Sequence, residues 1–149
     1  MDAIARIEAR EAVTRLIHAY CTTLDDGRLD DTADLFADGV WRPGPTLALT
    51  GRDEVAEFLH ANIILYADGT TGTRHVMSNI CIDLDEHGRS AIARSYVIVY
   101  QSIDRAQPHI IFQGRYEDSF SCRGGVWRFT ERRVLPDGFG DLTRHMRSA

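Results

Sequence analysis

Apolar residues in the first part of the chain recur at the spacing of helices. From residue 3 to residue 24 they return every three or four positions, which matches the turn of an α-helix. The same spacing predicts helices at 29–37 and from 51 to about 65. Gly27 and Gly39 follow the first two segments, as glycine commonly does at a helix end.

The rest of the chain carries the pattern of β-strands. β-Branched and aromatic residues alternate with polar ones between glycine-containing turns. A short strand is expected at Val40–Trp41, and the two prolines after it predict a loop or an interrupted edge strand. Pro136 is expected to end the last strand, leaving 139–149 as a tail over the surface or over a pocket mouth. The four long strands predicted are 72–82, 90–102, 109–122 and 126–135.

This order of elements indicates the fold class. Helices at the front and antiparallel strands behind them are typical of an α+β fold. Long strands with a helix laid across one face predict a strongly curved sheet around a cavity, which is the usual place for a ligand. The length of 149 residues corresponds to a single domain, 1–149, large enough for a substantial core.

The strand at 72–82 holds the first candidate for chemistry. Histidine is the side chain whose ordinary pKa, about 6.5, suits proton transfer near neutral pH. A structural histidine, hydrogen-bonded within the sheet, is the alternative interpretation of His75. Strict alternation places on one face Thr73, His75, Met77, Asn79 and Cys81.

Two residues of the first helix are further candidates. Tyr20 belongs to the apolar stripe, so its hydroxyl needs a polar partner in the interior. Asp25 comes at the C-terminal end, where the helix dipole disfavours a carboxylate. Each has a structural alternative, as a core tyrosine and as an ordinary turn residue.

The last strand offers an arginine whose direction depends on local geometry. If Trp127 and Phe129 face the interior, strict alternation turns Arg132 outward. Arg132 then reaches the interior only through a β-bulge, and Arg133 is the alternative.

Composition narrows the class of function. The net charge of −5 argues against a nucleic acid partner, which would need a clustered basic surface. No apolar run approaches the ~18–20 residues of a membrane span, and the start lacks the pattern of a signal peptide, so a cytoplasmic location is expected. No metal-ligand spacing or phosphate-binding glycine loop is present. Reduced, buried thiols are expected at Cys21, Cys81 and Cys122, and surface or turn positions at His18, His60, His87, His109 and His145.

These patterns together resemble the SnoaL-like branch of the nuclear transport factor 2-like superfamily. The resemblance implies a cone-shaped barrel in which three N-terminal helices pack on a strongly curved, mostly antiparallel sheet that encloses a pocket. It is carried by Tyr20 with Asp25, the segment 35–41, Gly51-Arg52-Asp53, Thr73-Arg74-His75 with Asn79, the segment 114–118, and Trp127-Arg128-Phe129 with Arg132.

The chain is most similar to the elimination enzymes of that superfamily, its dehydratases and a dehydrochlorinase. The resemblance implies that His75 and Asp25 form a catalytic dyad, with Tyr20 and Arg132 as further pocket residues. It implies a cofactor-independent, metal-free lyase or isomerase acting on a small apolar cyclic compound, such as a polyketide, steroid, terpene or aromatic. It also implies a homo-oligomer, a dimer or trimer.

Three alternative functions use the same fold. A non-catalytic protein that binds a small molecule keeps the cavity but needs no dyad in contact. The small subunit of a ring-hydroxylating dioxygenase uses the fold for assembly. An epoxide hydrolase requires two carboxylates and an arginine around a water, and the sequence offers no convincing second pocket carboxylate.

Overall fold

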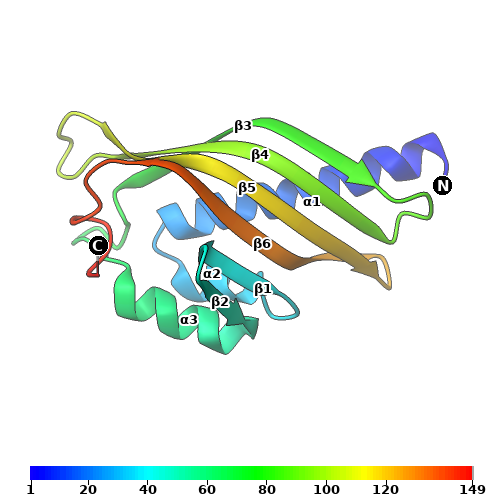
Figure 1. Cartoon of the computed structure of the whole chain (residues 1–149), viewed down its shortest axis with the longest axis horizontal. Helices are drawn as coiled ribbons and strands as arrows, with labels where there is room; N and C mark the ends of the chain where they lie inside the picture. Colours follow the sequence, from blue (N-terminus) through cyan, green and yellow to red (C-terminus); the bar gives the residue numbers. More distant parts are fainter. Residues whose placement is uncertain (149) are drawn as a thin grey trace.

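One six-stranded sheet curls over three helices in the computed structural model, which describes residues 1–148 (Figure 1). The predicted α+β class and the mostly antiparallel, curved sheet are confirmed. The elements are α1 (Ala3–Asp25), α2 (Leu29–Asp34), β1 (Val40–Gly44), β2 (Leu47–Thr50), α3 (Gly51–Asn62), β3 (Thr73–Leu84), β4 (Ser90–Gln101), β5 (His109–Arg123) and β6 (Val126–Phe139).

The strand order in the sheet is β2-β1-β6-β5-β4-β3. All neighbours are antiparallel except β1 and β6, which run parallel. The four long strands form the body of the sheet, and α1 lies across it while α2 and α3 lie near β1 and β2 (Figure 1). The expected interrupted edge strand after Val40 is present as the β1–β2 pair.

The first helix begins and ends as its sequence predicts. The Asp2 side chain accepts a hydrogen bond from the backbone N–H of Ala5 at 2.8 Å, which caps the N-terminus. Gly27 adopts φ +73°, and its N–H binds the carbonyl of Leu24. This termination leaves Asp25 in the last turn of α1, directed at the start of β3.

Several element ends differ from the sequence expectation. The helices α2 and α3 stop at Asp34 and Asn62, earlier than predicted. The last strand continues through Pro136 to Phe139. Its partner β1 pairs only as far as Arg133, so at Pro136 one side of β6 is an edge, a place where proline is tolerated in a sheet.

A β-bulge in β3 reverses the predicted alternation. The pairing with β4 shifts by one residue between Ser78 and Cys81, and Asn79 adopts φ +52°. As a consequence Ile82 is buried while Asn79 and Cys81 are exposed. The prediction that Asn79 and Cys81 share the His75 face, and that Cys81 is a buried thiol, was therefore wrong.

The strand β4 keeps strict alternation and sets the shape of the two sheet faces. Its inward residues are mostly small, which leaves room between the sheet and the helices. The outward face of the sheet exposes large apolar side chains, among them Val76, Ile92, Tyr96 and Ile110. No helix within residues 1–148 is long and apolar enough to cross a membrane.

Candidate active site

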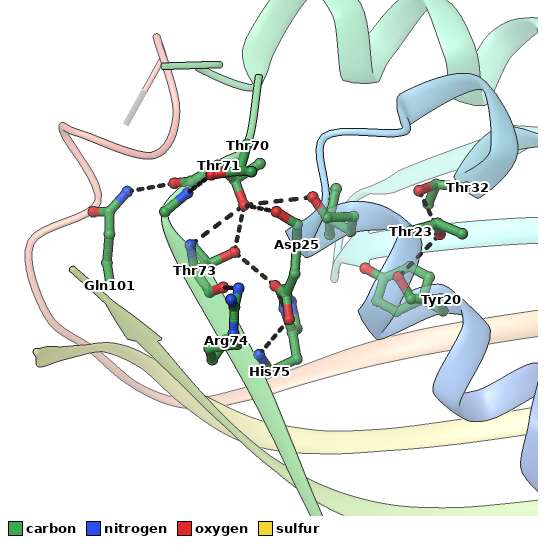
Figure 2. A network of polar contacts seen from close by, with 12 residues as sticks. Tyr20, Thr23, Asp25, Thr32, Thr70, Thr71, Thr73, Arg74, His75 and Gln101 are labelled. Carbon is green, nitrogen blue, oxygen red and sulfur yellow. Dashed lines mark hydrogen bonds and ion pairs between the residues drawn. The ribbon is translucent and has the colours of Figure 1, made fainter. Parts of the chain in front are cut away.

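The structure brings His75 and Asp25 into direct contact, although 50 positions separate them in the chain. Nδ1 of His75 lies 2.6 Å from Oδ1 of Asp25, and the backbone N–H of His75 donates to Oδ2 at 2.9 Å (Figure 2). The side chains are only 5% and 8% exposed. The predicted pair is therefore formed by the end of α1 and the start of β3.

Two threonines of the same segment hold the carboxylate in place. The hydroxyl of Thr73 donates to Oδ1 of Asp25 at 2.6 Å, and Thr71 Oγ1 lies 2.6 Å from Thr73 Oγ1 (Figure 2). Because the proton of Thr73 is used on Asp25, the hydroxyl of Thr71 is the donor to Thr73. Burial alone would raise the pKa of Asp25, but the hydrogen bonds and charge of His75 and the hydroxyl of Thr73 lower it below its ordinary value.

This arrangement fixes the tautomer of His75. An ionised carboxylate can only accept hydrogen bonds, so Nδ1 of His75 carries the proton. The lone pair then lies on Nε2, the nitrogen that a general base needs free. The geometry therefore suits proton abstraction by Nε2, with Asp25 stabilising the imidazolium that results.

The dyad lies at the wall of a cavity between the sheet and the helices. The cavity measures about 130 Å³, and both His75 and Tyr20 line it. A larger hollow of about 600 Å³ lies at Tyr66–Arg74 and the 102–105 loop, but His75 does not line it. Most of the wall of the smaller cavity is apolar, with Trp41, Phe58, Ile63, Val99, Phe112 and Met146 among its residues.

Two phenols add polar groups to this apolar wall. Tyr20 and Tyr116 both line the cavity and pack edge to face, with ring centroids 5.7 Å apart. The Tyr20 ring also meets the His75 ring edge to face at 6.1 Å. Burial raises the pKa of both phenols above the ordinary value, so both are protonated donors at neutral pH.

Arg132 faces the interior because β6 contains the β-bulge that the alternation of its residues required. Thr130 is the extra residue, because Glu131 pairs with Ser119 while Phe129 pairs with Phe120. Phe129 and Arg132 are consequently both fully buried, whereas the side chain of Arg133 is 52% exposed and pairs with Glu131.

Arg132 is not among the residues that line the cavity, and it lies behind the rings of Tyr20 and Tyr116. Its guanidinium makes two 2.8 Å hydrogen bonds to the carboxylate of Asp118. The same group lies 4.4 Å from the ring centre of Tyr20 and 4.1 Å from that of Tyr116. Burial opposes the charge of Arg132, but Asp118 more than offsets it and the pKa of the guanidinium rises. The Arg132–Asp118 pair therefore positions the rings of Tyr20 and Tyr116 from the side away from the cavity.

His145 lies in a turn, one of the two positions expected for it, but it is buried in the cavity wall rather than at the surface. It is 8% exposed and lines the cavity together with His75. The segment that carries it is fixed by hydrogen bonds to other elements, including one from Ile64 N–H to the His145 carbonyl at 3.0 Å. Of the other histidines, His18, His60, His87 and His109 are exposed as predicted.

The burial of His145 predicts a loss of stability in mild acid. Burial, with the charge of nearby His75, lowers the pKa of His145 to about 4, against about 6.5 in the unfolded chain. Between these values the unfolded chain binds a proton that the folded chain does not. The free energy of unfolding should then fall as the pH drops through this window, by up to about 1.4 kcal/mol per pH unit.

Urea denaturation at about pH 7 and pH 5 measures this effect. The His145→Leu variant should lose less stability between the two pH values than the wild-type protein. An equal loss in both proteins would contradict the assignment of this acid sensitivity to His145.

Comparison with known proteins identifies the family. The sequence matches the model of the SnoaL-like domain over residues 5–133, so the chain belongs to the SnoaL-like domain family. No protein of curated function gives a significant match.

Solved structures share the fold. A protein of Novosphingobium aromaticivorans provisionally named a scytalone dehydratase is 26% identical, with 94% of this chain and 91% of that chain covered and a TM-score of 0.75. An NTF2-like protein with a cystatin-like fold from the same organism is 22% identical, with coverage of 91% and 86% and a TM-score of 0.72. The beta subunit of a provisionally named aromatic-ring-hydroxylating dioxygenase, also from that organism, is 23% identical, with coverage of 92% and 94% and a TM-score of 0.71. The predicted NTF2-like fold is confirmed.

Sequence reasoning missed three residues of this region. Gly114, Tyr116 and Asp118 lie on one face of β5, because side chains alternate along a strand. The sequence could therefore have predicted that Tyr116 and Asp118 face inward together. His145 follows the last strand in a segment with little apolar pattern, and no periodicity marked it.

Within residues 1–148, no group of three or more His, Cys, Asp or Glu side chains is placed to hold a metal ion.

Proposed function

We propose that the protein is a cofactor-independent lyase or isomerase that removes a proton from a small cyclic substrate. One observation carries the proposal: His75 is held by Asp25 at 2.6 Å on the wall of an apolar cavity, with Nε2 left free. A positioned general base of this kind contributes about 10²–10⁴-fold to a rate.

The reaction begins at a carbon next to a carbonyl group. His75 Nε2 takes the proton, the C–H electron pair becomes part of a new C=C bond, and the carbonyl π pair moves to oxygen. In an elimination the electron pair on oxygen re-forms the carbonyl, the enolate pair forms a C=C bond to the β-carbon, and the β-substituent leaves with its bonding pair, a halide as the anion and a hydroxyl as water after taking the proton from the His75 imidazolium. In an isomerisation the imidazolium returns the proton to another carbon instead. Asp25 stabilises the imidazolium, and the phenols of Tyr20 and Tyr116 are available donors to the negative oxygen.

The size and lining of the cavity support a small apolar ligand. An enclosed volume of about 150 Å³ is enough to bind benzene in an engineered protein. The 130 Å³ here corresponds to one six-membered ring, and larger substrates would extend through the mouth. The likeness to a provisionally named scytalone dehydratase supports the elimination over the isomerisation.

The exposed apolar residues on the outer sheet face support a homo-oligomer, since a patch of this kind commonly marks a contact with another protein surface. The assembly would leave the cavity untouched, because the cavity opens on the opposite, helix-covered face of the sheet.

A panel of ring ketones with a hydroxyl or halide at the β-position tests the proposal. We expect the wild-type protein to convert at least one member with loss of water or hydrogen halide, measured by mass spectrometry, and the His75→Ala variant to convert it about 10²–10⁴-fold more slowly. Binding of panel members without any conversion would instead favour the non-catalytic binding protein.

A further inference from the structure

Contacts with two other parts of the fold hold the C-terminal segment, which carries His145, over the cavity. Met146 forms a β-bridge with Ile63 just after α3, and the N–H of Arg147 donates to the carbonyl of Asn62 at 2.8 Å. From the sheet, Gln101 Nε2 donates to the carbonyl of Arg144 at 3.1 Å. These bonds fix the backbone on both sides of His145, so its ring occupies a defined place in the wall.

The His145 ring has no polar partner in that place. Its Nδ1 is fully buried and has no hydrogen-bond partner within residues 1–148. A buried N–H donor without a partner costs about 1–3 kcal/mol, so the covered Nδ1 is a costly place for the ring proton. Since Nδ1 is covered, Nε2 is the ring nitrogen that a ligand in the cavity can reach.

Burial also decides which nitrogen carries the proton. A neutral imidazole has one N–H donor and one acceptor nitrogen. Among buried backbone groups, N–H donors without partners are rarer than acceptors without partners, and by the same reasoning the covered Nδ1 is the better place for the lone pair. The proton is then on Nε2, the nitrogen toward the cavity.

The two cavity histidines thus have opposite hydrogen-bonding roles. His75 carries its proton on Nδ1, bound to Asp25, and offers a lone pair. His145 has no carboxylate partner and offers an N–H. The family match ends at residue 133, so His145 belongs to a part of the chain outside the shared domain pattern.

We propose that His145 is a substrate-binding residue whose neutral Nε2–H donates a hydrogen bond to a carbonyl oxygen of the ligand, opposite His75. The substrate class is accordingly ring compounds with a carbonyl group. Where the proposed function holds, this bond also stabilises the negative oxygen formed when His75 removes the neighbouring proton. The carbonyl group and the neighbouring C–H of the substrate then lie between His75, the base from β3, and His145, the donor from the C-terminal segment.

The protonation state is tested directly by NMR of the ¹⁵N-histidine-labelled protein. At about pH 5.5, between the pKa of His145 and that of an ordinary histidine, we expect a neutral His145 ring with its proton on Nε2. Assignment by comparison with the His145→Leu variant identifies the signals. A charged ring, or a proton on Nδ1, would overturn the proposal.

The binding role is tested with acetophenone and ethylbenzene. The two compounds have the same carbon skeleton, and acetophenone has a carbonyl group where ethylbenzene has a CH₂ group. The wild-type protein should bind acetophenone more tightly by about 2- to 12-fold, the worth of one hydrogen bond. The His145→Leu variant should lose this preference while keeping its affinity for ethylbenzene, and His145→Gln, which retains an N–H donor, should restore part of it. A preference unchanged by His145→Leu, or equal or undetectable binding of both probes by the wild-type protein, would overturn the proposal.

These measurements separate the two proposals. The His75→Ala variant should retain the preference for acetophenone, because ground-state binding needs the donor and not the base. If the wild-type protein shows the preference but removes no proton from any ring ketone, the proposed function fails and the role of His145 stands. If proton removal is unaffected by His145→Leu and the preference persists, only the role of His145 fails.

Discussion

Replacement of His75 by alanine is expected to lower turnover by about 10²–10⁴-fold, the usual contribution of a positioned general base. The base lies on the mostly apolar wall of the cavity, and apart from His145 no other carboxylate or imidazole among residues 1–148 lines that cavity to replace it. The variant should fold, because alanine removes one ring from a region already bordered by open space. Turnover of the substrate found by the panel, with circular dichroism to confirm the fold, measures the effect.

A second histidine provides the matched control for this result. His18 is exposed on α1 and does not line the cavity, so His18→Ala should leave turnover unchanged. A folded His75→Ala protein with wild-type turnover would contradict the role of His75 as the base.

Replacement of Asp118 by asparagine is expected to destabilise the fold by about 3–5 kcal/mol, the cost of leaving a buried charge without its partner. Both side chains of the Asp118–Arg132 pair are 0% exposed, and the guanidinium cannot release its proton to avoid the penalty. For a chain of this length the loss corresponds to a fall in Tm of about 6–20 °C. Thermal unfolding of the wild-type and variant proteins provides the measurement.

The neighbouring exposed arginine provides a control for the buried one. Arg133 forms its ion pair with Glu131 at the surface, so Arg133→Met should change stability by no more than about 1 kcal/mol. Replacing the buried pair together, with Asp118→Leu and Arg132→Met, should recover most of the loss, because no unpaired charge remains. A change for Asp118→Asn as small as that for Arg133→Met would show that the pair does not carry this stability.

The sequence predicted the course of the chain well because periodicity reports which face of an element is buried. It placed Tyr20 inside, set Asp25 at the end of a helix and showed that Arg132 needed a bulge to face inward. The resemblance then joined Asp25 to His75, a contact across 50 positions that no local pattern could indicate.

The failures have a common physical origin in departures from regular backbone. The bulge at Asn79 reverses the face of every later residue in β3, and nothing in the apolar pattern marks where an extra residue is inserted. His145 reaches the cavity because backbone hydrogen bonds to residues after α3 fold its segment back, and such bonds depend on tertiary position rather than on side-chain type. The buried partner of Arg132, Asp118, was not recognised either, because the pair joins two strands and no pattern within one strand indicates it.

Proton removal by His75 is measured by hydrogen–deuterium exchange at the carbon next to the carbonyl of ring ketones in D₂O, followed by NMR. Exchange reports proton removal alone, so it does not depend on knowing the leaving group. We expect the wild-type protein to accelerate exchange above buffer, Asp25→Asn to lower the rate, and His75→Ala to lower it by about 10²–10⁴-fold. Exchange no faster than buffer with every ring ketone, or acceleration undiminished in the His75→Ala variant, would contradict the assignment of His75 as the base.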